Sequence, residues 1–246
     1  MNKFIVLSLL SATVVAPVSA TVLKSNLQVG AGYVKAFGDG AEPSNQDQKA
    51  IFDVVYAAKT DWGSSRVRAT LENPGRLNTT PKGFKVTSLK TESTTLIQLK
   101  QSSFSLWLDH QTNGNQKIAD NHVRAGISYS TNLGPIKFRT SLAPEYYFGH
   151  SPKGDAYGLQ MFNRTSFDYQ WSKQFSQKFL FENTSLRNEQ VQEAIGWKKH
   201  GYHYAIINNY KYNEKVSAKF IVHYFQSFAG FKFDAGSAVM LVRYKI

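Results

Sequence analysis

The feature that most constrains this chain is a period-two alternation of apolar and polar side chains that recurs along its length. The clearest example lies between Asn121 and Tyr146, where one alternating run ends at the turn signal Asn-Leu-Gly-Pro (132–135) and a second run follows. Successive side chains of a strand point to opposite faces, so the pattern predicts two antiparallel strands joined by a tight turn. One predicted face is apolar and the other is polar and carries cations. This combination is typical of a hairpin in a transmembrane β-barrel.

Repetition of this unit predicts twelve strands of about 9–13 residues, which is the length of a tilted strand that crosses a bilayer. Five short connections alternate with six longer ones. The predicted short turns are 60–63, 101–102, 132–135, 172–176 and 213–215. The predicted loops are 38–48, 74–89, 112–120, 147–158, 188–201 and 227–235. Short turns of such barrels are periplasmic. We therefore expect both termini in the periplasm and these loop residues outside: Asn45, Lys82, Gln116, Lys153, Glu193 and Phe231.

The first 20 residues have the composition of a secretory signal peptide. Lys3 provides a positive start, an apolar run follows, and Val18-Ser19-Ala20 forms a small-residue cleavage site. The apolar run is too short for a membrane-spanning helix, which needs about 20 residues. We expect cleavage of 1–20 and a single barrel over 21–246, with no second domain.

Composition agrees with export to the outer membrane of a Gram-negative bacterium. The chain has no cysteine, many aromatic residues (13 Tyr, 17 Phe and 4 Trp) and a formal net charge of +12, of which Lys3 would leave with the leader. The absence of cysteine excludes a disulfide scaffold and a thiolate metal site. A strongly basic exported chain usually has an anionic partner. The partners expected here are acidic sugars and the lipid and lipopolysaccharide of the outer membrane; no nucleic-acid motif occurs.

The predicted inward face carries far more cations than carboxylates. An interior lined by cations raises the local concentration of anions, and arginine binds a carboxylate through two parallel hydrogen bonds. A different interpretation is that the cations pair with inward acids, such as Glu72, Asp109, Glu145, Asp168 and Glu182, and fill a narrow interior. The predicted lumen-lining, substrate-binding cations are Arg66, Arg68, Lys100, Arg124, Lys137, Arg139, Arg164, Lys219 and Arg243, with Lys245 at the end of the last strand.

Two stretches resemble the oligogalacturonate-specific porin family, which includes the sialic-acid channel. They are SFSLWLDHQTNG…NHVRAGISYSTNLGPIKFRTSLAPEYYF and AIGWKKHGYHYAIINNYKYNEKVSAKFIVHYFQ. The resemblance covers about residues 100–246 and includes the pieces His110-Gln-Thr-Asn-Gly and Lys198-Lys199. It implies a twelve-stranded monomeric barrel with arginine-lined passage of acidic sugars. The chain departs from the family where several inward cations are lysines and where Ile246 takes the place of a terminal aromatic residue.

The sequence therefore predicts an all-β, antiparallel, transmembrane barrel that acts as a passive, anion-selective porin for acidic mono- or oligosaccharides such as uronates or sialic acid. The alternatives are a nucleoside-type channel, for which the inward aromatics are Trp107 and Phe162, a general small-solute channel, and a receptor or adhesin barrel. A phospholipase would need a serine nucleophile near His110, and none follows that residue as the chemistry requires. We therefore expect no enzyme activity, no catalytic residue, no metal and no cofactor.

Overall fold

The structure is a computed structural model that describes residues 21–37, 49–73, 88–100, 102–114, 119–151, 154–195, 198–227 and 235–246. These residues form twelve strands and one helix. The elements are β1 (Val22–Phe37), β2 (Lys49–Thr60), β3 (Gly63–Asn73), β4 (Ser88–Gln98), β5 (Phe104–Gly114), β6 (Ala119–Leu133), β7 (Ile136–Ser151), β8 (Gly154–Gln170), β9 (Phe175–Ser185), α2 (Glu189–Ile195), β10 (Gly201–Lys211), β11 (Val216–Gln226) and β12 (Ala235–Lys245).

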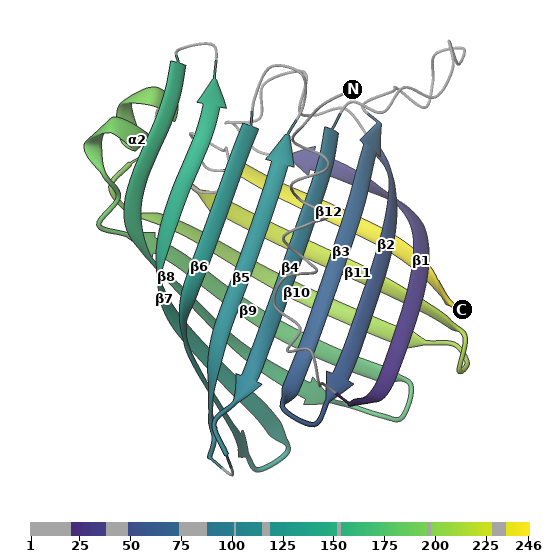
Figure 1. The fold of residues 1–246 in the computed structure, drawn as a ribbon. Coiled ribbons are helices and arrows are strands. Elements are labelled where there is room, and N and C mark those ends of the chain that lie inside the picture. The colour runs from purple at the N-terminus through teal and green to yellow at the C-terminus, as the bar shows by residue number, and fades with distance from the viewer. Residues whose placement is uncertain are drawn as a thin grey trace, which may run out of the picture.

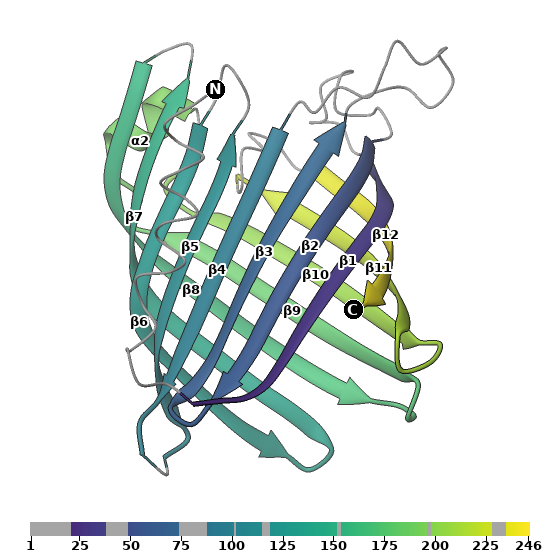
Figure 2. The same ribbon diagram turned by 45° about the vertical axis from the view of Figure 1, so that its right-hand side comes forward.

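Each strand pairs antiparallel with the next, and β1 pairs with β12 to close the barrel. Figure 1 shows β9 to β12 running behind the nearer strands and across their direction, and Figure 2 shows the same closed wall from the side. Closure lets the paired segments of the strands make their backbone hydrogen bonds within the sheet, which allows such a chain to span lipid. The predicted fold class and the predicted twelve strands are confirmed.

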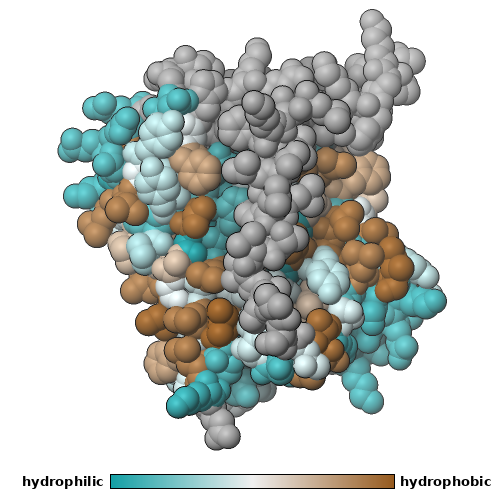
Figure 3. Space-filling model, in the orientation of Figure 1, coloured by the Kyte–Doolittle hydropathy of each residue, from teal (hydrophilic) through white to brown (hydrophobic). Residues whose placement is uncertain are grey.

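The two faces of the wall follow the predicted alternation. Outward apolar side chains are exposed, for example Ile127 at 53% and Met240 at 56%, whereas inward neighbours such as Ser128 and Leu241 are buried. Figure 3 shows hydrophobic side chains over the outer face of the strands, on both sides of the grey atoms, with hydrophilic ones towards the two ends. This outer band is what a lipid-facing barrel requires.

The two ends of the barrel differ. At one end, here called the turn end, strands are joined by short connections at 61–62, 99–103, 134–135, 171–174 and 212–215. The opposite end, here called the loop end, has the remaining connections. Residues 1–20 and the predicted loop positions Asn45, Lys82, Gln116, Lys153 and Phe231 lie outside the described residues.

The prediction of a loop over 147–158 is wrong, because β7 continues to Ser151 and β8 begins at Gly154. The alternation of faces persists there: Tyr146 is exposed and Tyr147 is buried on the inner side. Two adjacent tyrosines on opposite faces hide the period-two pattern, since both look alike in a sequence. The two strands consequently have 16 and 17 residues, and β8 extends past β9 at the loop end.

The predicted loop over 188–201 contains the helix α2. Asn188 precedes the helix, and its side-chain oxygen accepts a hydrogen bond from the Gln190 amide at 2.8 Å, which is an N-cap. Val191 is buried against Tyr147 and Ala156, both on the inner face of β7 and β8. Gly158 allows the close approach, since a Cβ atom there would lie 2.8 Å from Val191. The helix therefore packs inside the loop end of the barrel (Figure 2). No helix among the described residues is long and apolar enough to cross a bilayer.

Candidate functional site

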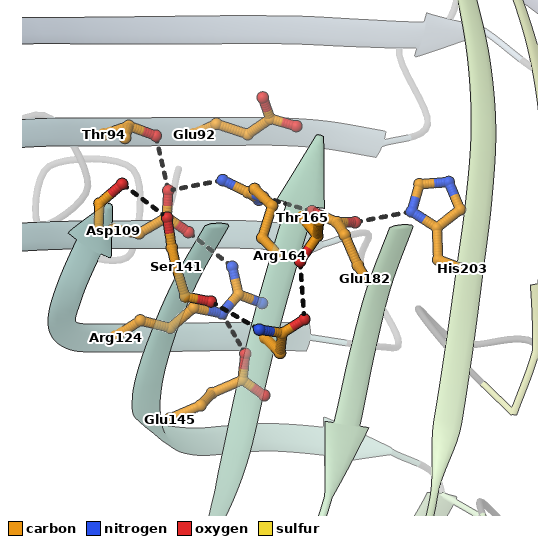
Figure 4. A network of polar contacts seen from close by, with 12 residues as sticks. Glu92, Thr94, Asp109, Arg124, Ser141, Glu145, Arg164, Thr165, Glu182 and His203 are labelled. Carbon is orange, nitrogen blue, oxygen red and sulfur yellow. Dashed lines mark hydrogen bonds and ion pairs between the residues drawn. The ribbon is translucent and has the colours of Figure 1, made fainter. Parts of the chain in front are cut away.

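The inner wall holds the titratable side chains of this molecule, and Arg124 lies at the centre of their largest network. Arg124 on β6 is flanked in register by Asp109 on β5 and Glu145 on β7. Its Nη1 donates to Asp109 Oδ2 at 2.6 Å and its Nε donates to Glu145, as Figure 4 shows. Arg124 is 3% exposed and Glu145 is fully buried. Two carboxylates therefore compensate one buried guanidinium.

A second arginine extends this network across β8, β9 and β10. Arg164 donates from Nε to Glu182 at 2.5 Å, and its Nη1 lies 3.7 Å from Asp109. Glu182 also contacts Nδ1 of His203 at 2.6 Å, and His203 Nε2 lies 2.8 Å from the Nδ1 of His223 on β11. The chain of contacts thus runs from β5 to β11 and involves seven adjacent strands, and Figure 4 shows it as far as His203 on β10.

In another part of the inner wall, Asp53 on β2 forms ion pairs with two arginines. Arg68 donates to Asp53 at 3.1 Å from one side, and Arg243 on β12 donates to it from the other. Glu92 lies 4.0 Å from Arg66 and 3.8 Å from Arg68. Cations therefore outnumber carboxylates in this group of five residues.

Aromatic rings narrow the interior beside the arginine network. Trp107 and Phe162, the inward aromatics that the sequence predicts, are each 1% exposed and their ring centres lie 5.8 Å apart. The guanidinium carbon of Arg124 lies 3.8 Å from the centre of the Phe162 ring, and that of Arg164 lies 5.3 Å from Trp107. A cation over an aromatic face is attracted by the ring quadrupole. Phe225 packs against this cluster from β11, so opposite walls meet at this level.

The predicted cations fall into three groups. Five are paired with carboxylates: Arg66, Arg68, Arg124, Arg164 and Arg243. Lys137, Arg139 and Lys219 are inward but form no ion pair with any described residue. The placement of Lys100 on the inner wall is wrong, since this exposed residue lies in the turn after β4 with a φ of 50°. The pattern Gln98-Leu99-Lys100 still alternates, but the strand has already ended.

The interior is thus partly filled by ion pairs, as expected if the inward cations pair with inward acids. This pairing nevertheless leaves an excess of positive charge on the inner wall. Among the inward strand residues whose side chains the structure describes, each carboxylate has a cationic partner. These carboxylates are Asp53, Glu72, Glu92, Asp109, Glu145, Asp168 and Glu182. Because Lys137, Arg139 and Lys219 remain, the described inner wall has unpaired cations and no unpaired carboxylate.

Sequence reasoning missed Arg187, which anchors the segment around α2. Arg187 is 3% exposed, donates from Nε to Gln160 at 2.9 Å and from Nη2 to Thr184 at 2.5 Å. Its Nη1 donates to the carbonyl oxygens of Lys198 and Ser227. Gln160 in turn donates to Glu145, so the loop-end segment is joined to the Arg124 network. The residue is the last of a predicted strand, and nothing in its neighbourhood in the sequence marks it as buried.

The described residues contain no group of three or more His, Asp or Glu side chains arranged to hold a metal ion. No protein-family model matches the chain, and no curated protein matches it.

Solved structures share its fold. The NanC porin superposes with a TM-score of 0.59 at 11% identity, over 89% of this chain and all of that one. The COG4313 outer membrane channel from Pseudomonas putida F1 gives 0.52 at 10% identity, over 94% of this chain and all of that one. The translocator domain of autotransporter NalP from Neisseria meningitidis gives 0.50 at 8% identity, over 99% and 95% of the two chains. NanC is a porin of the small twelve-stranded family that the sequence resembles, so the resemblance is confirmed for the fold.

Proposed function

We propose that this protein is an outer-membrane channel for small anionic solutes, in particular acidic mono- and oligosaccharides such as uronates or sialic acid. The observation that carries the proposal is the charge balance of the inner wall, where each described carboxylate is paired and cations remain. A fixed cation lowers the electrostatic energy of a passing carboxylate, and several weak sites in series avoid trapping it.

The cations that select the solute are Lys137 and Arg139 on β7 and Lys219 on β11. All three lie in the half of the barrel nearer the turn end. The arginines of the central network contribute less, because their charge is already compensated by Asp109, Glu145 and Glu182 (Figure 4). This assignment differs from an arginine ladder in which every inward cation acts alike.

We place the barrel in the outer membrane of a Gram-negative bacterium after removal of residues 1–20, as a monomer without enzyme activity. The lipid-facing band of Figure 3 and the porin fold support this location. The turn end then faces the periplasm and the loop end faces outward.

Reversal potentials in a KCl gradient across a planar bilayer test the proposal. The wild-type channel should prefer chloride, and the Lys137→Gln/Arg139→Gln variant should lose much of that preference because two unpaired charges are removed. A Lys198→Gln/Lys199→Gln variant, which removes two exposed charges near α2, is the control and should keep it. The preference should also weaken at about 1 M salt, where screening acts over about 3 Å. A wild-type channel without anion preference would reject the proposal and favour a neutral-solute channel.

A further inference from the structure

A cavity of about 380 Å³ opens on the inner wall at the turn end, away from the Arg124 network. Its lining comes from β1, from the ends of β8 and β9 and the connection between them, and from β10, β11 and β12. Four cations line it: Lys173, Lys211, Lys219 and Arg243. No carboxylate is among the lining residues, which otherwise include four side-chain amides and two serine hydroxyls.

The cations of this cavity are available to a ligand. Lys219 is half-buried, lies in register between Asn209 and Leu241, and forms no ion pair with a described residue. Arg243 shares Asp53 with Arg68, and Arg68 shares Glu92 with Arg66, so these three arginines have two carboxylates between them. A cation that has lost part of its hydration without gaining a counter-charge is stabilised when an anion binds beside it.

Apolar side chains lie next to the lining residues Asn209 and Lys219 along the inner wall. Ile207 on β10 and Ile221 on β11 are paired in register, two residues away along their strands from the pair Asn209 and Lys219. Ile221 belongs to a buried apolar cluster that includes Leu241, and Ile207 packs against this cluster. Low polarity beside a charged group strengthens its attraction to an anion. A carboxylate at Lys219 would therefore interact more strongly than one at a lysine fully surrounded by water.

The amides and hydroxyls indicate the rest of the ligand. Gln28 and Asn209 are inward on β1 and β10, and each side-chain amide can both donate and accept hydrogen bonds, as sugar hydroxyls do. The volume lies in the range of about 300–1,000 Å³ that ligand pockets have. We propose that this cavity is a binding site for a sugar acid, with the carboxylate at Lys211 and Lys219 and the hydroxyls at the amides.

This inference rests on the proposed function and adds to it a site where the solute binds after it has passed the part of the interior that Trp107 and Phe162 narrow. The central network presents compensated charges to a passing anion, whereas the cavity at the turn end presents Lys219, which forms no ion pair with a described residue. The solute would bind there at the end of its passage towards the periplasm.

A ligand-observed NMR titration of the detergent-solubilised full chain tests the site with three probes: galacturonate, galactose and acetate. Galacturonate should bind at least about tenfold more tightly than either of the others, since only it offers both chemistries, and the Lys211→Gln/Lys219→Gln variant should bind it about tenfold more weakly. The Lys198→Gln/Lys199→Gln variant is the matched control and should bind as wild type. Asn209→Ala should weaken galacturonate binding without changing that of acetate, a readout that does not depend on the lysine variant folding.

Equal galacturonate affinity in the two lysine variants would overturn the inference, and so would acetate binding as tight as that of galacturonate. The reversal potentials above are measured separately. A wild-type channel that prefers chloride while the cavity variant binds galacturonate normally would disprove the cavity site alone. Binding of galacturonate at this site in a channel without anion preference would disprove the proposed function alone.

Discussion

Arg124 illustrates how a charged side chain can belong to the structure of a channel wall more than to its conduction. The guanidinium is buried between Asp109 and Glu145 and stacks on Phe162. Burial of such charges is costly, and the attraction between them repays the cost only while all partners are present. Loss of the arginine leaves two buried carboxylates without their main counter-charge.

We expect Arg124→Gln to lower the free energy of unfolding by about 3–5 kcal/mol, which is the usual effect of breaking a buried ion pair. Arg139→Gln is the matched comparison, because Arg139 forms no ion pair with a described residue, and it should change stability by less than about 1 kcal/mol. Urea unfolding of the barrel in lipid vesicles measures both. Equal losses would show that Arg124 is not a structural residue.

Apart from Lys100, the inward direction of the predicted cations could be read from the sequence, but their pairing could not. Period two alone assigns Arg124 and Arg139 to the inner face. The acids that neutralise Arg124 lie 15 and 21 positions away in the chain, on two other strands, so their contact depends on the register of both hairpins. The same dependence separates Arg124, which is paired, from Arg139, which is not.

At the scale of single elements, the hairpin of β6 and β7 shows a case where local signals suffice. Gly134 has a φ of 60° and precedes Pro135, which fits the first of the two central positions of a type II′ turn, where glycine is favoured. The outward side of β4 is less regular, since Thr91 and Thr95 stand where apolar residues are expected. Each makes a hydroxyl hydrogen bond to a neighbouring strand, Thr91 to Thr112 at 2.7 Å and Thr95 to Ser65 at 3.2 Å. These bonds satisfy polar groups on the outer wall and explain the weak alternation of this strand.

The middle of β11 provides a test of the in-and-out assignment. Phe220 is outward and 47% exposed, so Phe220→Arg should destabilise the barrel by about 2–4 kcal/mol, the cost of a cation on the lipid face near the bilayer midplane. Ser217→Arg, on the inner face of the same strand, should be tolerated. Folding yields into vesicles compare the two variants, and equal yields would show that the faces of β11 are reversed.

The segment around α2 gives a prediction about the loop end. Arg187→Ala removes the contacts to Gln160, Thr184 and the carbonyl of Lys198, so the segment should separate from the wall. Trypsin should then cut faster after Lys198, and single-channel conductance should rise because the entrance is wider. Gln190→Ala, an exposed helix position, is the control. Unchanged cleavage and conductance would mean that Arg187 does not hold this segment in place.

At the scale of the whole molecule, we predict the orientation in the membrane from the difference between the two ends. Glu193 on α2 and Lys173 in the turn after β8 are both exposed and lie at opposite ends of the barrel. A cysteine at position 193 should react with a membrane-impermeant maleimide on intact cells, and one at position 173 only after the outer membrane is opened. The chain has no native cysteine to interfere. Labelling of position 173 but not of position 193 on intact cells would show that the orientation is the opposite of the predicted one.

Because β8 is longer than β9, this barrel has a stretch of unpaired strand edge, which closed sheets usually lack. Pairing between them stops at Met161 and Ser185, so no described strand lies beside β8 from Gly154 to Gln160 on that side. That stretch is an edge strand, and an edge can accept an extended peptide as an additional strand. Helix α2 packs at Gly158 in the middle of it. We expect this edge to accept an extended peptide through main-chain hydrogen bonds, with little dependence on the peptide's side-chain sequence.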